Sequence, residues 1–170
     1  MESKRPGNSA SLPYLIDGNV KLTQSGAIIR YLARKHNLIG TTEDEQRQED
    51  IIDGVMGDIR SGWSMLCYKS NDFDADKVMY RKDRLTPVLA ELDQWFAKNE
   101  YVVGSKLTYG DFKVFEVIDG HAKLFPDLLD EFPNIKKHHD KIGNLKGVKE
   151  YLASDRNPAA LNGSSAKWKG

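Results

Sequence analysis

Two short apolar segments, followed by a change of sequence period, constrain the fold most strongly. The segments LPYLID, residues 12–17, and VKLTQ, residues 20–24, are joined by Gly18-Asn19, and this dipeptide supplies the positive φ angles of a tight hairpin turn. Apolar and polar side chains alternate along the second segment, which is typical of a half-buried strand. From Ser25 the spacing becomes helical, with one face formed by Ile28, Tyr31, Leu32 and Lys35. We therefore expect a β-hairpin followed directly by a helix.

The chain from residue 43 onward carries apolar residues at helical spacing. Such stripes predict amphipathic helices that bury one face. The first stripe consists of Ile52, Val55, Met56, Ile59, Trp63 and Leu66, and the second of Leu85, Val88, Leu89, Leu92, Trp95 and Phe96. Shorter helices are expected around 135–142 and 148–152, with Pro126, Pro133 and Pro158 at their boundaries. The predicted fold class is mainly α, with helix everywhere beyond residue 43.

The segment KLTYGDF, residues 106–112, predicts the start of another helix. The Thr108 side chain can accept a hydrogen bond from the amide of Asp111, and the Asp111 carboxylate can accept one from the amide of Thr108. This reciprocal arrangement is a capping box, with Asp in the place of Glu. The buried face of the helix would continue through Phe112, Phe115, Ile118 and Ala122.

Three glycines interrupt the first apolar stripe, at Gly54, Gly57 and Gly62. Each costs about 1 kcal/mol of helix propensity relative to alanine. We expect these small residues to let another helix or backbone approach closely, which would offset that cost.

An acidic break, SNDFDAD, follows at residues 70–76. Its spaced aspartates resemble the opening of a calcium loop. The sixth position of that loop requires glycine, however, and here it is Lys77. We therefore interpret the segment as a solvated loop.

Charge and cysteine content exclude several classes of protein. Lys plus Arg and Asp plus Glu both number 25, so the formal net charge is zero, which argues against nucleic-acid binding through a basic surface. The single cysteine, Cys67, cannot form an intrachain disulfide and favours a reducing compartment. We expect Cys67 to be a buried apolar residue rather than a nucleophile.

Targeting and metal-binding signals are not visible in the sequence. No apolar run has the roughly 20 residues of a membrane span, and no signal peptide precedes the first segment. The four histidines have no ligand spacing, so no metal is expected. We expect a cytoplasmic protein whose final residues, SAKWKG, form a solvated tail.

Four blocks of the sequence, taken together, resemble a mu-class glutathione S-transferase. They are LPYLIDGNVKLTQSGAIIRYLARKHNL from Leu12, DIR at 58–60, MLCY at 65–68 and LTYGDF at 107–112. The resemblance runs from about Leu12 to near the C-terminus. It implies an all-helical glutathione transferase C-terminal domain at residues 41–170, preceded at residues 1–40 by a β-hairpin and a helix that remain from a thioredoxin-like, glutathione-binding domain.

The resemblance also implies a glutathione site. In the family, the residue matching Leu12 precedes a cis-proline, here Pro13, and offers its backbone to the cysteinyl part of glutathione. The residues matching Gln24 and Ser25 hold the γ-glutamyl end. A serine that opens a helix suits this role, because its amide and hydroxyl face a carboxylate together with the positive end of the helix dipole.

Two further positions of the resemblance lie in the first long helix. The residue matching Asp58 reaches across a homodimer to the γ-glutamyl ammonium of the ligand on the partner subunit. The residue matching Tyr68 lines the electrophile pocket and donates a proton to some substrates. Taken singly, these residues have structural interpretations: Ser25 as a helix cap, Gln24 as a sheet-edge amide, Asp58 as a solvated helix residue and Tyr68 as a core residue. Their joint, ordered match favours the site.

The sequence departs from the family before Leu12. There the family has a strand–helix–strand unit, which carries the tyrosine that stabilises the glutathione thiolate. Such a unit needs about 30 residues or more, whereas eleven residues precede Leu12, and Ser11 stands where the family usually has Asn. No tyrosine of this sequence matches the catalytic one, Tyr14 included. We therefore expect reduced or absent activity, and we expect residues 1–11 or another chain to cover the open edge of the first strand.

Three functions remain open from sequence. The first is a homodimeric glutathione transferase that acts in detoxification by conjugating its co-substrate glutathione to apolar electrophiles. Its activity would be impaired. The second is a non-catalytic protein that binds apolar molecules in the helical domain. The third is an interaction module that recruits a partner through its dimer face and strand edge. We expect the first as family and as function, and for the mechanism the second is a close alternative.

Overall fold

The computed structural model describes residues 12–170, and the expected hairpin stands at their start. Strand β1 (Tyr14–Asp17) pairs antiparallel with β2 (Val20–Thr23). Gly18 in the turn has a φ of 58°, which a residue without a Cβ adopts at little cost. The expected cover of the outer edge of β1 by residues 1–11 lies outside the described residues.

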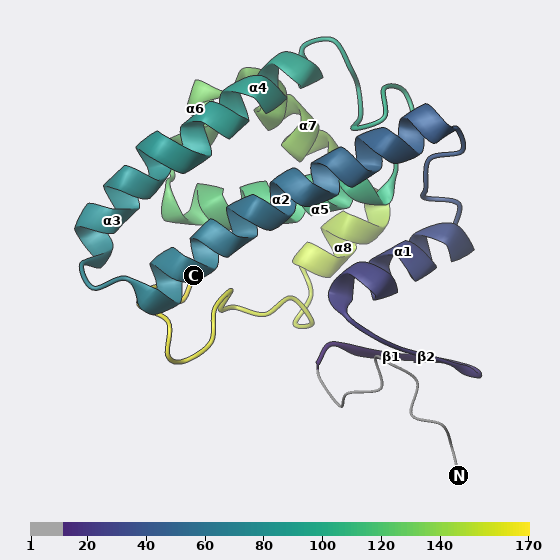
Figure 1. Cartoon of the computed structure of the whole chain (residues 1–170), viewed down its shortest axis with the longest axis horizontal. Coiled ribbons are helices and arrows are strands. Elements are labelled where there is room, and N and C mark those ends of the chain that lie inside the picture. Colours follow the sequence, from purple (N-terminus) through teal and green to yellow (C-terminus); the bar gives the residue numbers. More distant parts are fainter. Residues whose placement is uncertain (1–11) are drawn as a thin grey trace.

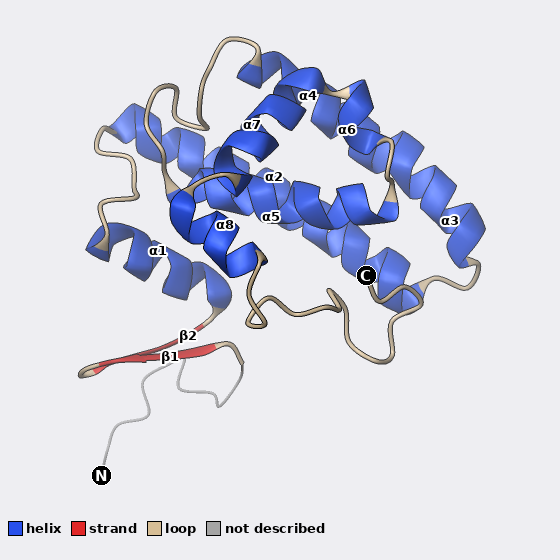
Figure 2. Cartoon of the chain, turned by 180° about the vertical axis from the view of Figure 1, so that it is seen from behind, coloured by secondary structure: helices blue, strands red, loops and turns tan. Residues whose placement is uncertain are grey.

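Helix α1 (Ser25–Lys35) follows the hairpin directly and packs on both strands. The Tyr31 hydroxyl donates a hydrogen bond to the Asp17 carboxylate over 2.9 Å, and Lys35 forms an ion pair with the same carboxylate. Figure 2 shows the hairpin at the edge of the molecule, with α1 between it and the other helices. The change of period at Ser25 is thus confirmed as the boundary between sheet and helix.

The rest of the described chain is mainly helical, as the apolar stripes predict. Helix α2 (Glu43–Lys69) crosses the molecule from end to end and packs along α5 (Figure 1). The later elements are α3 (Phe73–Tyr80), the π-helical turn η1 (Arg81–Leu85), α4 (Thr86–Phe96), α5 (Tyr109–Leu124), α6 (Leu128–Glu131), α7 (Pro133–Gly143) and α8 (Lys146–Leu152). Residues 97–108 and 153–170 contain no helix, so the expectation of helix everywhere beyond residue 43 is wrong for these two connections.

One apolar core lies among α2, α4, α5 and α7. It contains most members of both predicted stripes, and complete burial of each large apolar side chain contributes about 1.5–3 kcal/mol. Its fully buried members include Met56, Leu85, Leu89, Ile118, Leu128 and Ile135. Trp63 and Trp95, which we expected in this core, are half-buried at its margin, because each indole N–H donates a hydrogen bond to an oxygen there.

The capping box of α5 is present as predicted. The amide of Thr108 donates to Asp111 Oδ2 over 2.8 Å, and the amide of Asp111 is bound in return by the Thr108 side chain. Asp111 is fully buried and also accepts hydrogen bonds from the amide of Val102 and from His138 Nε2, over 2.8 and 2.9 Å. The cap therefore joins α5 to the preceding loop and to α7.

The three glycines of α2 have different surroundings. A Cβ at Gly62 would lie 2.8 Å from Cε2 of Tyr80, so glycine is needed there for close packing. Around Gly54 and Gly57 no described atom lies within 4 Å of a Cβ position. The expected close approach is confirmed at Gly62 and is wrong for the other two within this chain, because they face outward.

Two segments that we expected to be solvated are ordered by specific contacts. Asp72 caps α3 by accepting a hydrogen bond from the amide of Ala75 over 3.2 Å, so the acidic break becomes helix from Phe73. Near the C-terminus, the Lys167 amide donates to the carbonyl of Cys67 over 2.7 Å, and the Trp168 ring packs on α2. The prediction of a solvated tail is therefore wrong, because an apolar ring within it is worth burying.

The hairpin and α1 are tied to the helical domain by polar contacts. Asp53 of α2 pairs with both Arg30 of α1 and Lys113 of α5. The amide of Tyr109 donates to the carbonyl of Leu38 over 2.8 Å. A domain boundary near residue 40 stays a prediction.

Candidate functional site

The hairpin register brings four of the expected site residues together. Tyr14 is opposite Thr23 in the antiparallel pair, so the Leu12-Pro13 step and the Gln24-Ser25 step lie at the same end of the hairpin. The Leu12-Pro13 peptide bond is cis, as the resemblance implied. The Leu12 side chain is 90% exposed. This end of the hairpin therefore presents backbone and side-chain polar groups to the surroundings.

Gln24 and Ser25 stand where the strand turns into α1. Gln24 has a φ of 72°, a left-handed conformation that costs a non-glycine residue roughly 1 kcal/mol or more and is often found at functional sites. Both side chains are exposed. The chain direction reverses here without a glycine.

The N-terminus of α1 has no side-chain cap among the described residues, although the Gln24 carbonyl accepts from the amides of Ala27 and Ile28. Its first turn carries no acidic residue. The first amides of a helix need acceptors and carry partial positive charge. A carboxylate placed beside Gln24 and Ser25 would meet both needs.

Asp58 and Tyr68 occupy a different region, on α2. Asp58 and Tyr68 are ten residues apart in this helix, which corresponds to about 15 Å along the helix axis. Asp58 is exposed and lines a groove of about 770 Å³ between α2 and α3, together with Met65 and Met79, which are each 60% exposed. The structure therefore does not bring Asp58 to the hairpin end within one chain.

Tyr68 meets the C-terminal segment, a contact that sequence reasoning missed. Its hydroxyl oxygen accepts a hydrogen bond from the amide of Gly163 over 2.8 Å. An amide can only donate, so the hydroxyl proton of Tyr68 remains free for another acceptor. The residues LNG at 161–163 carry a turn signal in Asn-Gly, but nothing in the sequence pairs that turn with α2.

The neighbouring Cys67 is fully buried, as predicted. Burial raises the pKa of its thiol to about 11. A thiol of this kind is almost wholly protonated at neutral pH and is a poor nucleophile. Cys67 is therefore a packing residue of α2.

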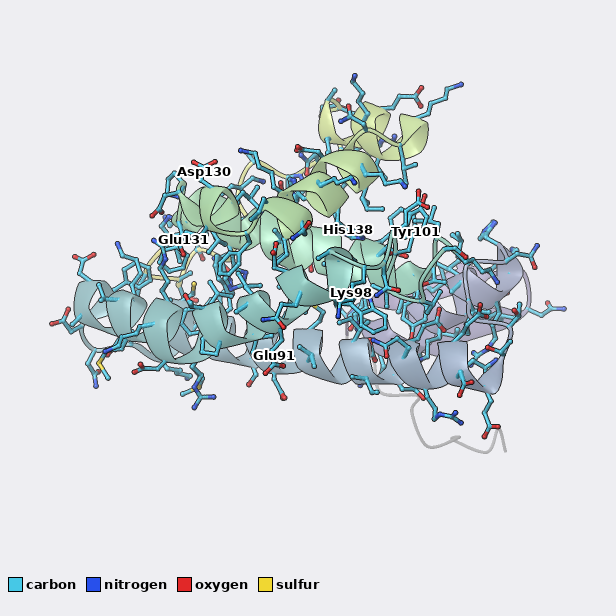
Figure 3. The ribbon with its side chains drawn as sticks, turned by 90° about the horizontal axis from the view of Figure 1, so that it is seen from above. Glu91, Lys98, Tyr101, Asp130, Glu131 and His138 are labelled. Atoms are coloured by element: carbon cyan, nitrogen blue, oxygen red, sulfur yellow. The ribbon has the colours of Figure 1, made fainter. Side chains whose placement is uncertain are left out.

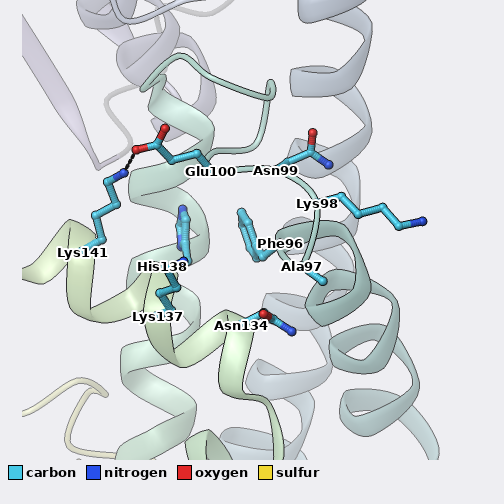
Figure 4. Close-up of a pocket in the computed structure, with 9 residues that line it drawn as sticks. All are labelled: Phe96, Ala97, Lys98, Asn99, Glu100, Asn134, Lys137, His138 and Lys141. Atoms are coloured by element: carbon cyan, nitrogen blue, oxygen red, sulfur yellow. Dashed lines mark hydrogen bonds and ion pairs between the residues drawn. The ribbon is translucent and has the colours of Figure 1, made fainter.

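A second, polar hollow of about 350 Å³ lies away from these residues, between the end of α4 and α7 (Figure 4). His138 stacks on Phe96 there, with ring centroids 4.0 Å apart, and Lys141 pairs with Glu100 at the rim. Seen from above, His138 and Lys98 lie well away from Glu131 of α6 (Figure 3). His138 Nε2 is bound to Asp111 of the α5 capping box, whereas its Nδ1 is buried without a hydrogen-bond partner among the described residues.

The described residues offer neither a metal site nor a membrane-spanning helix. No group of three His, Cys, Asp or Glu side chains within residues 12–170 is placed to hold a metal ion. Within the same range, no helix is long and apolar enough to span a membrane.

Sequence comparisons decide the family. Residues 57–155 match the family described as "Glutathione S-transferase, C-terminal domain", and residues 3–34 match "Glutathione S-transferase, N-terminal domain". The chain belongs to the glutathione S-transferase family. The N-terminal end of α1 and the Leu12-Pro13 step fall within or beside the N-terminal match, and Asp58 and Tyr68 fall within the C-terminal one.

Relatives of this glutathione S-transferase chain include mu-class proteins. Glutathione S-transferase Mu 2 of Mus musculus is 42% identical over 146 residues, which cover 86% of this chain and 66% of the relative. Glutathione S-transferase Mu 3 of Homo sapiens is 38% identical over 159 residues, which cover 93% of this chain and 70% of the relative. The chain thus spans about two thirds of the length of such relatives.

Solved structures of the family have the same fold. The glutathione S-transferase Blo t 8 superposes with a TM-score of 0.85 at 30% identity, covering 94% of this chain and 76% of that one. A Pi-class glutathione S-transferase of Onchocerca volvulus gives a TM-score of 0.82 at 32% identity, covering 92% and 76%. The mainly helical fold with a two-stranded hairpin is therefore that of a glutathione S-transferase, and the expected mu-class resemblance is confirmed.

Proposed function

We propose that this chain binds glutathione at the hairpin end and conjugates its thiolate to apolar electrophiles. The observation that carries the proposal is the N-terminus of α1, without a side-chain cap, beside Gln24 and Ser25, at the same end of the hairpin as Leu12 and Pro13. The γ-glutamyl carboxylate of glutathione would lie beside the amides of Ser25 and Gly26, which precede the two amides bound by the Gln24 carbonyl. The backbone of Leu12 then receives the cysteinyl part.

Asp58 acts in this proposal from a second subunit. Its carboxylate is exposed on the α2–α3 face, where it can pair with the γ-glutamyl ammonium of glutathione bound to the partner of a homodimer. The outward-facing Gly54 and Gly57 and the exposed Met65 and Met79 lie on the same elements. Met65 and Met79 line the same groove as Asp58, and exposed apolar side chains of this kind are common on surfaces between subunits.

The chemistry has two forms, which use Tyr68 differently. With an aryl halide, the thiolate forms the new carbon–sulfur bond and the halide leaves with the bonding electrons, so no proton is needed. With an epoxide, the carbon–oxygen bond breaks and the oxygen takes a proton from the Tyr68 hydroxyl, which solvent then restores. The free hydroxyl proton of Tyr68 supports this second role.

The rate expected for a polypeptide of these 170 residues is low. A thiol with a pKa of about 8.5 is only a few per cent ionised near neutral pH. Lowering that pKa by two units corresponds to about 2.7 kcal/mol of thiolate stabilisation, and no described tyrosine is matched to that task. Proximity of the two reactants remains as a source of acceleration.

Glutathione titration tests the binding site directly. Ser25→Ala removes the hydroxyl at the start of α1, and we expect the affinity for glutathione to fall about tenfold. Ser64→Ala, an exposed serine on α2, is the matched control and should leave the affinity unchanged. Equal affinities for the two variants would contradict the assignment of Ser25.

The initial rate of conjugation to an aryl halide tests the reaction. Saturable turnover above the rate in buffer supports the transferase. Glutathione binding without turnover would instead favour a non-catalytic binding protein of this family. Sedimentation at several protein concentrations tests whether the chain forms a homodimer. Glutathione titration of Asp58→Ala then tests whether Asp58 of one subunit contributes to the affinity of the other.

A further inference from the structure

The C-terminal segment, residues 158–170, returns to α2 and covers Cys67 and Tyr68. In Figure 1 it runs from α8 back along the molecule, and its end lies at the C-terminal half of α2. Two of its backbone amides hold it there: the Lys167 amide donates to the carbonyl of Cys67, and the Gly163 amide donates to the side-chain hydroxyl of Tyr68. Asn162, directly before Gly163, holds the segment on α2 through its side chain.

The Asn162 side chain makes three contacts at once. Its Oδ1 accepts a hydrogen bond from the indole N–H of Trp63 over 3.1 Å. Its Nδ2 donates to the carbonyl of Trp168 over 3.0 Å and lies 3.7 Å from Sγ of Cys67. The Asn162 amide thus contacts two side chains of α2, Trp63 and Cys67, and the backbone of Trp168 later in the same segment.

The orientation of this amide is determined by its partners. An indole N–H only donates and a backbone carbonyl only accepts. Turning the Asn162 amide over would place its NH2 group against the Trp63 N–H and its oxygen against the Trp168 carbonyl. Only one orientation satisfies both partners, so Asn162 fixes the position of the residue that follows it, Gly163.

An aromatic pair reinforces the same connection. Trp63 and Trp168 meet edge to face, with ring centroids 5.2 Å apart, an arrangement worth about 0.5–1.5 kcal/mol beyond the buried area. Trp63 also packs on His121 of α5, with centroids 4.4 Å apart. The anchor point of Asn162 is therefore held rigidly by the core.

We propose that Asn162 is the positioning residue for Tyr68: through Trp63 and Trp168 it holds the Gly163 amide against the Tyr68 hydroxyl oxygen. The consequence for catalysis rests on the proposed function. With the oxygen of Tyr68 occupied by a donor, its proton points elsewhere and is available to an epoxide oxygen. Asn162 thereby favours electrophiles that need a proton over those that do not.

The thiol of Cys67 provides a readout that needs no activity. It is the single cysteine of the chain and is fully buried beneath the segment, so a chromogenic aromatic disulfide reacts with it only when the segment opens. When reclosure is faster than labelling, the labelling rate is proportional to the population of the open state. Labelling therefore measures how firmly the segment is held.

The first experiment compares labelling rates of Asn162 variants. Asn162→Asp keeps an oxygen for Trp63 but places a carboxylate oxygen against the Trp168 carbonyl, and we expect labelling to accelerate at least about tenfold. Trp63→Phe, which keeps a ring but removes the N–H, should accelerate it in the same direction. Asn157→Ala is the control just before the segment, because the Asn157 side chain donates to the local carbonyl of Leu152. Labelling of Asn162→Asp at the control rate would overturn the proposal.

A double-mutant cycle then tests the link to Tyr68. Tyr68→Phe removes the acceptor of the Gly163 amide, and its effect on labelling should be much smaller in the Asn162→Asp background than in the native chain, because Asn162 is what places that amide. Non-additive opening free energies support the positioning role. Additive ones overturn it, whatever the activity of the protein. Far-ultraviolet circular dichroism confirms that each variant is folded.

Activity separates this inference from the proposed function. The ratio of kcat/KM for an epoxide to kcat/KM for an aryl halide should fall in both Tyr68→Phe and Asn162→Asp, and it should stay unchanged in Asn157→Ala. A ratio that falls in Tyr68→Phe alone would overturn the role of Asn162. If the native chain turns over neither electrophile, the proposed function fails, and the labelling cycle still decides whether Asn162 positions the Gly163 amide.

Discussion

The hydroxyl of Tyr80 lies 2.8 Å from Nε2 of His121, and both side chains are buried in the helical domain. The other ring nitrogen, Nδ1, lies 2.6 Å from the carbonyl of Val117, so Nδ1 carries the proton and Nε2 accepts from the tyrosine. His121 is therefore held neutral, with both nitrogens satisfied. Burial is the main reason that its pKa is lowered from 6.5 to about 4, and the bond to Val117 opposes this only in part.

The pairing predicts a loss of stability in mild acid. The unfolded chain binds a proton at His121 below its ordinary pKa of 6.5, whereas the folded chain does so only below about 4. The contribution is fully present above pH 6.5 and is lost as the pH falls toward 4, by about 3 kcal/mol in all. Urea unfolding of the native chain and of His121→Phe across this range measures it. The native chain should lose more stability than the variant, and parallel pH profiles would contradict the assignment.

A pair of glycine substitutions in α2 should have opposite signs. Gly62→Ala places a Cβ 2.8 Å from the Tyr80 ring, and we expect the free energy of unfolding to fall by about 1–3 kcal/mol because the packed ring must move. Gly54→Ala meets no described atom within 4 Å, so the gain in helix propensity should raise stability by up to about 1 kcal/mol. Denaturant unfolding of both variants at one protein concentration makes the comparison. Similar effects at the two positions would show that the close contact with Tyr80 is unimportant.

Replacing the buried carboxylate of Asp111 by the amide of Asn should destabilise the chain. Its two oxygens accept from the amides of Val102 and Thr108, so either orientation of Asn places an NH2 group against a backbone donor. We expect Asp111→Asn to destabilise the chain by about 2–4 kcal/mol, nearly as much as Asp111→Ala, because buried donors are left unsatisfied. Thermal and urea unfolding of the two variants test this, with exposed Asp140→Asn as the control. A harmless Asp111→Asn would show that the cap does not depend on charge.

The ion cluster at Asp53 should control how firmly α1 is attached. Asp53→Ala leaves Arg30 and Lys113 without their shared carboxylate, and burial together with the neighbouring Arg30 already lowers the pKa of Lys113. We expect a loss of about 1–3 kcal/mol, felt mainly at α1. Hydrogen exchange should accelerate in residues 25–35 more than in α4. The exposed Asp50→Ala is the matched control, and uniform acceleration in all helices would argue against a local effect.

Local signals in the sequence predicted much of the fold. Gly18-Asn19 predicted the turn, and the Thr108–Asp111 pair predicted the cap, because both depend on residues within a few positions of each other. The apolar stripes predicted α2 and α4 because helical spacing alone determines which residues share a face. The residues at the end of the hairpin followed as well, since antiparallel register places the Leu12-Pro13 and Gln24-Ser25 steps together.

Contacts between distant residues were decided only by the tertiary structure. The sequence predicted close packing at Gly54, Gly57 and Gly62 alike. Only the contact with the Tyr80 ring distinguishes Gly62 from the other two. Gly163 reaches Tyr68 across 95 residues of sequence, and no periodicity encodes such a pairing. Sequence by itself therefore determined the hairpin, the long helices with most of their buried faces, and the family resemblance. The tertiary structure decided which polar groups meet across elements, because burial leaves each of them only those partners that packing brings within hydrogen-bond distance.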